Sequence, residues 1–267
     1  MQERHINRYQ YFEEQEITTQ KYVLPLLQEL KSIDESTAVL EIGCGEGGNL
    51  IPFLNLGCKN IVGIDIEEVK IENAKNFFGE MEIDNDVKFI CDDIYNISVE
   101  DIGQFDIIIT RDVIEHIHNQ EKFMNFVKKF MKSDAKFFLG FPPWFNPFGG
   151  HQQVCESKVL SHLPFFHILP NPLYKFILKS FGETDSKIEG LLEIKETGIT
   201  IERFERILRE NNYRKDKRLF YFINPNYEVK FGLKPRTSWK LFSSIPFVRN
   251  FFMTAGYYVV SQNDSTS

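Results

Sequence analysis

The chain has little of what several classes of protein depend on. Its 267 residues include only four cysteines, Cys44, Cys58, Cys91 and Cys155, and no two have the close spacing of a zinc knuckle or a redox pair. Acidic residues (38) outnumber lysine and arginine (31), and the net charge of −7 argues against a nucleic-acid partner, which usually meets a basic face. No apolar run approaches the roughly 18 residues that a membrane span needs. The polar start at residues 1–5 lacks the apolar stretch of a secretory signal, so we expect a cytoplasmic location.

What the chain does have is an alternation of short apolar runs and helical patterns. Seven runs are predicted to be strands, at residues 37–42, 60–66, 87–91, 105–110, 136–141, 217–223 and 256–260. Helical patterns are found at 49–56, 68–78, 99–102, 121–131 and 200–211. Near-continuous apolar strands separated by helices indicate a parallel sheet covered on both faces. We therefore predict an α/β fold, Rossmann-like and doubly wound, with a mostly parallel seven-stranded sheet and helices on both faces.

Three other segments complete the predicted organisation. Residues 1–36 have a helical pattern, and we expect them to form an N-terminal helical lid on a main domain at 37–267; a simple packing helix is the alternative. Prolines, glycines and aromatic residues interrupt the regular pattern after the fifth strand, which indicates a helical and aromatic insertion at about 142–198. A second insertion at about 225–252 follows the sixth strand.

The first predicted strand ends in a glycine-rich loop, EIGCGEGG at residues 41–48. Glycines there permit positive φ and let backbone N–H groups approach a ligand closely. The spacing at 43–48 fits the G-x-G-x-x-G dinucleotide fingerprint, with Asp65 at a suitable distance for a ribose. The spacing at 41–47 also fits E-x-G-x-G-x-G. Glu41 favours the second reading without deciding between the two, because an acid beside the loop is unfavourable for a diphosphate and favourable for a ligand with an ammonium and a sulfonium group.

These residues resemble the class I S-adenosylmethionine-dependent methyltransferases. VLEIGCGEG at 39–47 matches that superfamily's first motif, and FDIIITRDVIEHI at 105–117 resembles the ubiquinone-biosynthesis-like branch (methyltransferase types 11 and 12), including its Glu-His pair. The resemblance covers residues 37–142 closely and the part from 200 onward more loosely. It implies S-adenosylmethionine as the cofactor and S-adenosylhomocysteine as its product.

The resemblance also implies which residues bind the cofactor. The candidates are Glu41, Gly43, Cys44, Gly45 and Gly47 in the loop, Asp65 and Ile66 after the second strand, Asp92, Asp93 and Ile94 after the third, and Thr110 and Arg111 after the fourth. In the family the acid at the Asp65 position holds both ribose hydroxyls. Asp93 with Ile94 is the first choice for the adenine and Asp92 the second, and the backbone near Thr110 and Arg111 faces the methionine part.

Two histidines are the candidate catalytic residues. His151 follows the fifth strand and His116 the fourth, and ligands of open α/β sheets bind at the carboxyl ends of strands. An acceptor that carries a proton can need a general base, for which histidine is the usual side chain near neutral pH. Asp112, Glu115 and His116, with His151 as a fourth ligand, also resemble the metal site of small-RNA 2′-O-methyltransferases. We predict no metal, since the Glu-His pair also occurs in metal-free relatives.

The sequence therefore predicts a methyltransferase that acts on a small, hydrophobic or ring-bearing acceptor by in-line displacement. The aromatic insertion would cover the acceptor; a packing layer is an equal alternative, and a membrane-facing patch that draws in a lipid-like acceptor is a third, which we do not favour. A non-catalytic protein that binds an adenosyl ligand is the main alternative function. An NAD-dependent oxidoreductase is less favoured, because the one Tyr-x-x-x-Lys match, Tyr213 to Lys217, leads into a strand.

Overall fold

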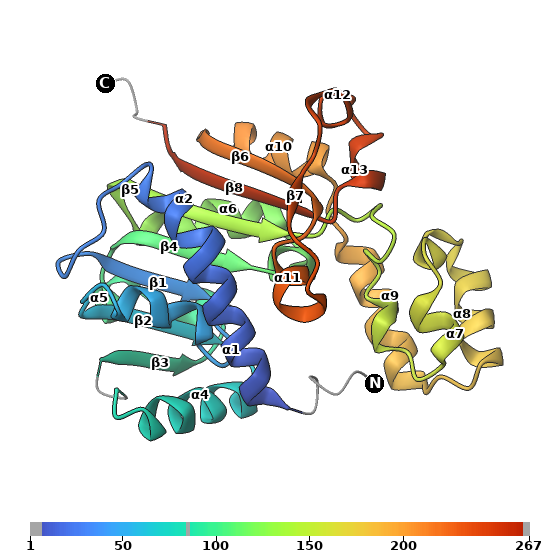
Figure 1. The fold of residues 1–267 in the computed structure, drawn as a ribbon, viewed down its shortest axis with the longest axis horizontal. Coiled ribbons are helices and arrows are strands. Elements are labelled where there is room, and N and C mark those ends of the chain that lie inside the picture. The colour runs from blue at the N-terminus through green and yellow to red at the C-terminus, as the bar shows by residue number, and fades with distance from the viewer. Residues whose placement is uncertain (1–6, 84–85, 264–267) are drawn as a thin grey trace.

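The computed structural model describes residues 7–83 and 86–263, so the polar start at 1–5 lies outside the described residues. Its sheet has the strand order β3-β2-β1-β4-β5-β8-β6-β7 (Figure 1). The strands are β1 (Ala38–Ile42), β2 (Asn60–Asp65), β3 (Val87–Cys91), β4 (Phe105–Arg111), β5 (Met131–Phe141), β6 (Tyr213–Ile223), β7 (Arg236–Thr237) and β8 (Ala255–Gln262). Strands β1 to β5 pair in parallel, and β8 is antiparallel to both β5 and β6.

The α-helices are α1 (Arg8–Thr18), α2 (Leu24–Gln28), α3 (Ile51–Leu54), α4 (Glu68–Glu80), α5 (Val99–Ile102), α6 (Gln120–Val127), α7 (Lys158–His162), α8 (Asn171–Ser180), α9 (Asp185–Thr197), α10 (Ile201–Glu210), α11 (Asn226–Phe231), α12 (Lys240–Ser243) and α13 (Arg249–Phe252). A π-helical turn, η2 (Thr19–Val23), joins α1 to α2. The 3₁₀ turns among the described residues are η3 (Gly48–Leu50), η4 (Ile94–Asn96), η5 (Ile114–His116), η6 (Lys128–Phe130), η7 (Gln152–Val154) and η8 (Phe166–Ile168).

Two hydrophobic cores cover the two faces of the sheet, because neighbouring residues of a strand point to opposite sides. On β1, Val39 belongs to the core shared with α1, α2, α3 and α4, and Leu40 to the core shared with α6 and α10. On β4, Ile107 and Ile108 divide in the same way. The prediction of a mostly parallel sheet with helices on both faces is therefore confirmed.

The predicted strands all form, with some changes at their ends. Strand β5 begins at Met131 rather than at 136, because an irregularity in its pairing with β4 lets Met131 pair with Phe105 before the regular register starts. Strand β6 begins at Tyr213 rather than at 217. An eighth strand, the two-residue β7, pairs with β6 inside the second insertion and was not predicted.

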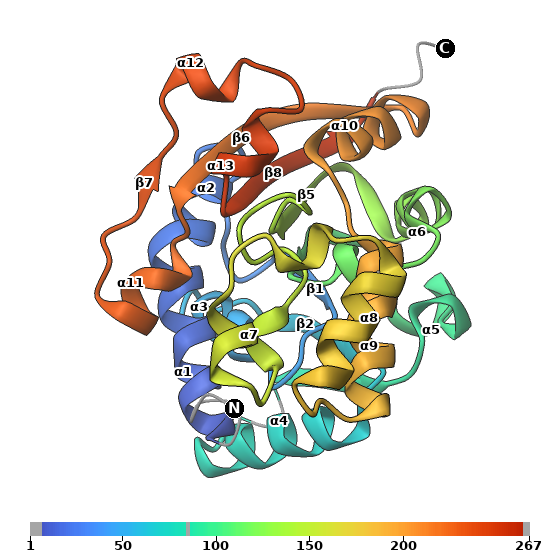
Figure 2. The ribbon, with the colours of Figure 1, turned by 90° about the vertical axis from the view of Figure 1, so that its right-hand side faces the viewer.

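The first insertion has a hydrophobic core of its own. It forms α7, α8 and α9, and its buried residues are Cys155, Leu160, Phe166, Tyr174, Leu178, Ile188 and Leu191. Two of its aromatic residues, Phe166 and Tyr174, pack on each other there, with ring centroids 4.7 Å apart. The arrowheads of β3, β4 and β5 point toward these helices (Figure 1), and Figure 2 shows them in front of the strands. The insertion thus lies at the carboxyl end of the parallel sheet.

Within the described ranges, 7–83 and 86–263, none of the helices combines the length and the apolar character needed to cross a bilayer.

Candidate functional site

The glycine loop after β1 is fixed to the end of β2 by backbone groups. The N–H groups of Gly43 and Cys44 both donate to the carbonyl oxygen of Ile64, at 2.7 and 3.0 Å. The N–H of Gly45 donates to Oδ2 of Asp65 at 2.8 Å. Gly43 and Gly45 have φ of 75° and 55°, and Gly47 has φ of 82°, so the loop uses the backbone freedom that its glycines provide.

Asp65 is buried at the end of β2, and both of its carboxylate oxygens bind backbone. Oδ2 accepts from Gly45, and Oδ1 accepts from the N–H of Glu67 at 3.0 Å. The next side chain, Ile66, is 72% exposed although it is large and apolar. A carboxylate beside an uncovered apolar side chain is an arrangement that suits a ribose and the base attached to it.

The acids after β3 are engaged in local turns. Asp92 Oδ1 accepts from Asn96 Nδ2 at 2.7 Å, and Asp93 Oδ1 caps η4 by accepting from the N–H of Tyr95 at 3.0 Å. Ile94 is buried in the core on the other side of this turn. The adenine contacts expected of Asp92, Asp93 and Ile94 remain predictions, and Ile66 is the exposed apolar side chain at this rim.

Glu41 connects the loop to β4 through a chain of hydrogen bonds that sequence reasoning missed. Its Oε1 accepts from Asn49 Nδ2 at 2.5 Å, and Asn49 Oδ1 accepts from the Thr19 hydroxyl at 2.7 Å. Arg111 Nη1 donates to the same hydroxyl at 3.3 Å. Burial raises the pKa of Glu41 to about 8. In the sequence, this network of hydrogen bonds is indicated only by Asn49, a polar residue in the otherwise apolar start of a predicted helix. Thr19 gives no such indication.

Helix α1 lies directly on the loop. Arg8 forms an ion pair with the buried Glu46, and its Nε lies 2.6 Å from Glu46 Oε1. Burial and the negative charge of Asp112 raise the pKa of Tyr11, also on α1, to about 12. Four residues of the next turns, Val23, Leu24, Leu26 and Leu27, belong to the same hydrophobic core as Phe12 of α1. Helix α2 is therefore a packing element, and a lid formed by α1 remains a prediction.

Several buried oxygens around the loop have no hydrogen-bond partner among the described residues. They are Gln15 Oε1 on α1, Glu41 Oε2 on β1, Glu46 Oε2 in the loop and Thr110 Oγ1 on β4. Buried polar groups are normally paired, so unpaired ones call for an explanation. All four can accept a hydrogen bond, and two are carboxylate oxygens. The site therefore suits a ligand that donates hydrogen bonds and carries positive charge.

The structure brings the two candidate catalytic histidines together. His151 is half-buried and has φ of 54°, and its ring centroid lies 5.0 Å from that of His116. Burial lowers the pKa of His151 to about 3, with a further contribution from His116. The contact joins the start of the first insertion to the turn after β4. The sequence proposes both residues, and it groups them only through the resemblance to a metal site.

Glu115 completes this cluster as a buried acid. Its side chain is 3% exposed, and neither carboxylate oxygen has a partner among the described residues. Burial and the charge of Asp112 raise its pKa well above the usual range. Glu115, His116 and His151 offer ligand atoms within 4.8 Å of one another, so they could hold a metal ion. Asp112 lies outside this group and is 4.0 Å from Arg111 Nε.

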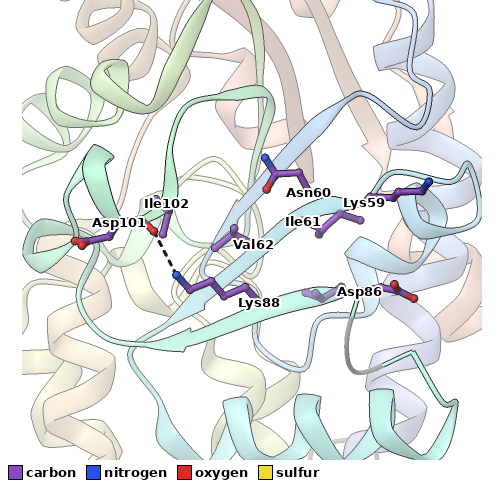
Figure 3. A pocket seen from close by; sticks show the side chains of 9 residues that line it. Lys59, Asn60, Ile61, Val62, Asp86, Lys88, Asp101 and Ile102 are labelled. Carbon is purple, nitrogen blue, oxygen red and sulfur yellow. Dashed lines mark hydrogen bonds between the residues drawn. The ribbon is translucent and has the colours of Figure 1, made fainter.

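Tyr213 and Lys217 do not form a dehydrogenase pair. Both lie on β6, where the Tyr213 hydroxyl donates to the carbonyl oxygen of Met124 at 2.8 Å and Lys217 pairs with Glu29. A hollow of about 320 Å³ lies at the opposite end of the sheet, where β2 and β3 begin (Figure 3). It is lined by residues such as Asn60 and Lys88, and none of the predicted site residues takes part.

A second histidine, buried beneath the turn that carries His151, is expected to make the stability of the protein depend on pH. His167 is fully buried beneath this turn, its Nε2 lies 2.8 Å from the Trp144 carbonyl oxygen, and burial lowers its pKa from 6.5 to about 4. Because the folded chain disfavours the protonated ring, the free energy of unfolding is expected to fall as pH drops from 6.5 toward 4. The loss for this residue is about 3 kcal/mol. In His167→Gln, urea denaturation should show a smaller loss over this range, while the exposed control His162→Gln should match the wild type. Equal pH dependence in all three chains would contradict the assignment.

Comparisons with known proteins identify the family of the chain. A family described as a methyltransferase domain matches residues 33–211. An mRNA cap guanine-N(7) methyltransferase of Schizosaccharomyces pombe is 36% identical over 69 residues, and a ubiquinone biosynthesis O-methyltransferase of Bartonella quintana is 30% identical over 106 residues. These alignments cover 26% and 39% of this chain, and it spans only 19% and 41% of those two proteins.

A solved structure extends the likeness of the fold to most of the chain. The geranyl diphosphate C-methyltransferase of Streptomyces coelicolor A3(2), in complex with Mg²⁺, geranyl diphosphate and S-adenosyl-L-homocysteine, superposes with a TM-score of 0.54. The match covers 90% of this chain and 78% of that one, at 10% sequence identity. Since the family match spans more than half of the sequence, the chain belongs to this family of methyltransferase domains, within the class I superfamily that uses S-adenosylmethionine.

Proposed function

We propose that the protein transfers a methyl group from S-adenosylmethionine to a small acceptor with a hydrophobic or ring-bearing body, in the cytoplasm. The observation that carries the proposal is the set of unpaired buried oxygens around the glycine loop, which includes Glu41 Oε2 and Thr110 Oγ1. These atoms favour a ligand with an ammonium and a sulfonium group, and they disfavour the diphosphate of NAD.

The residues present fit S-adenosylmethionine in three parts. Glu41 and Thr110 would hold the amino-acid part, Asp65 the ribose hydroxyls, and Ile66 one face of the adenine. When bound, the cofactor supplies a methyl group on a good, neutral leaving group. The chain's own task is then mainly to exclude water and to align the acceptor with that methyl, because such a displacement gains most from orientation.

Glu41 predicts a pH-dependent affinity for the cofactor. Its pKa near 8 keeps the carboxyl largely protonated at neutral pH, and a cationic ligand favours the ionised form. The affinity for S-adenosylmethionine is therefore expected to rise as pH approaches 8, by at most about tenfold per pH unit. Calorimetry should show weaker binding and a flatter pH dependence in Glu41→Gln. Glu67→Gln is the control, because it removes an exposed acid at the same rim. A Glu41→Gln chain with wild-type affinity at every pH would contradict the role.

His151 is proposed to orient the acceptor by accepting a hydrogen bond from it. Its pKa near 3 keeps the ring neutral throughout the physiological range, so the ring can accept a hydrogen bond but is too weak a base to take a proton. We expect His151→Gln, which moves the accepting atom, to lower kcat by about tenfold, the value of one hydrogen bond, with little change in cofactor affinity. The matched control is His118→Gln, since His118 is exposed and pairs with Glu193 instead. If His151→Gln retains wild-type kcat, or if the control loses as much, His151 has no such role.

The test of the function itself has two stages. Calorimetric titration with S-adenosylmethionine, S-adenosylhomocysteine and NAD should give micromolar binding of the two adenosyl ligands only. A panel of phenolic, prenyl and acyl-chain acceptors is then assayed for transfer of a labelled methyl group. Cofactor binding without transfer to any acceptor would favour the alternative, a non-catalytic protein that binds an adenosyl ligand. Binding of NAD, or of none of the three, would overturn the proposal.

A further inference from the structure

The second insertion places charged and aromatic residues in an inverted pattern. On α13, Arg249 and Asn250 are buried, whereas Phe251 and Phe252 are exposed. In a surface helix of a water-facing protein the apolar residues usually face the core and the charged ones face solvent. The reversal indicates that this surface is built to meet something other than water.

The inversion is held in place by specific contacts with α10. Arg249 Nε donates to Glu202 Oε1 at 2.9 Å, and Asn250 Nδ2 donates to Glu202 Oε2 at 2.5 Å. The N–H of Phe247 donates to Glu202 Oε1 at 2.8 Å, and Asn250 Oδ1 accepts from the N–H of Ile201 at 2.8 Å. The phenylalanines are therefore turned outward by a polar anchor on their inner side, and their exposure is not the result of loose packing.

The second insertion leaves many apolar side chains exposed, and we call these residues the aromatic surface. Its members are Phe231, Leu233, Trp239, Phe242, Ile245, Phe247, Val248, Phe251 and Phe252. Trp239 and Phe247 are 77% and 69% exposed. Ring contacts link Trp239 to Phe242 at 6.2 Å and Phe242 to Phe252 at 5.6 Å. Both views place α12 at the periphery of the molecule, and Figure 2 shows β7 at its edge as well (Figures 1 and 2).

The charge of this segment is opposite to that of the chain. The second insertion, residues 225–252, contains five lysines and arginines and a single acidic residue, Glu228, while the whole chain carries −7. Of these five, Lys234 and Arg236 are exposed near the aromatic surface, and Arg249 is used in the anchor. Cations next to exposed tryptophan and phenylalanine are the combination that binds the boundary between headgroups and acyl chains of an anionic bilayer.

We infer that the aromatic surface docks the protein on an anionic lipid bilayer. A second copy of the chain is the less suitable occupant, because a symmetric contact would place the same cations opposite each other. The surface also adjoins the first insertion, the segment that the sequence predicts to cover the acceptor: the ring centroid of Phe251 lies 5.1 Å from that of Phe145 and 6.2 Å from that of Phe165. A docked chain would therefore hold the first insertion close to the bilayer. This inference does not depend on which acceptor is methylated.

The test is co-sedimentation of the full chain with vesicles, at low and high salt. We expect binding to vesicles of phosphatidylcholine mixed with phosphatidylglycerol, weaker binding to phosphatidylcholine alone, and a loss of binding in high salt. The double substitution Trp239→Ser with Phe247→Ser should lower the affinity for the mixed vesicles by at least about tenfold, since it removes two large apolar side chains. Lys234→Glu with Arg236→Glu should lower it on the mixed vesicles but not on phosphatidylcholine alone.

The matched control is Phe176→Ser on α8. Phe176 is 66% exposed, almost as much as Phe247, but it lies outside the aromatic surface, so binding should be unchanged. The fluorescence of the wild type should shift to the blue on mixed vesicles, and Trp239→Phe should abolish the shift. No vesicle binding by the wild type, or equal losses in Phe176→Ser and in the double variant, would overturn the inference. A wild-type dimer in sedimentation equilibrium that is absent in the double variant would also overturn it, because a second copy of the chain would then occupy the aromatic surface.

Discussion

Replacing Asp65 with alanine is expected to weaken the binding of S-adenosylmethionine by about 100-fold or more, which corresponds to about 3 kcal/mol. The carboxylate acts twice in this site. It holds the glycine loop through the Gly45 N–H at 2.8 Å, and it is the acid proposed to accept from the ribose hydroxyls. Charge-assisted hydrogen bonds are worth about 1.5–3 kcal/mol each, so losing two of them accounts for the expected effect. Calorimetric titration of S-adenosylmethionine and S-adenosylhomocysteine measures it.

A second variant separates the two tasks of Asp65. Asp65→Asn keeps one oxygen that can accept from a backbone N–H, but it removes the negative charge and the second acceptor. We expect it to unfold close to the wild-type temperature and still to lose most of the affinity. If Asp65→Asn binds the cofactor as the wild type does while Asp65→Ala does not, then Asp65 organises the loop and does not contact the ribose.

The sheet and the residues at the strand ends could be predicted because they depend on short, local sequence patterns. A strand buried on both faces needs a near-continuous apolar run, and a loop with positive φ needs glycine, so β1, Gly43 and Gly45 leave a direct trace in the sequence. The parallel order then brings Asp65 to the loop, because the carboxyl ends of neighbouring strands share one edge of the sheet. None of these steps needs knowledge of distant side-chain packing.

Features that depend on contacts between distant segments could not be predicted in this way. The hydrogen bonds of Asn49 to Glu41 and Thr19 depend on where α1 lies on the loop, and the sequence gives only its helical pattern. The contact of His116 with His151 depends on the path of an insertion rich in proline and glycine. The burial of Arg249 depends on Glu202, an acid on another element. In each case a residue from a distant segment determines the environment of the side chain. The hydrophobic periodicity of the sequence carries no information about such a contact.

Gly48→Ala is expected to be among the most destabilising single substitutions in the chain, at about 3 kcal/mol, the upper end of what overpacking costs. A Cβ at this position would lie 2.2 Å from the backbone oxygen of Phe12 and 3.0 Å from Gln15 Cβ. Because the nearer atom is backbone, relief requires α1 to move away from the loop. That movement would separate Arg8 from Glu46 and Thr19 from Asn49. Urea denaturation measures the loss, and the affinity for S-adenosylmethionine should fall with it.

Gly79→Ala is the matched control, because a Cβ at that exposed position in α4 would meet no atom within 4 Å. Alanine is favoured over glycine inside a helix, so this variant should be more stable than the wild type by about 0.5–1 kcal/mol. The same change from glycine to alanine is therefore expected to lower the free energy of unfolding at position 48 and to raise it at position 79. If Gly48→Ala keeps wild-type stability but loses cofactor affinity, α1 moves freely and acts as a lid. If it keeps both, α1 does not rest on the loop as the structure has it, and the proposed connection between α1 and the cofactor is wrong.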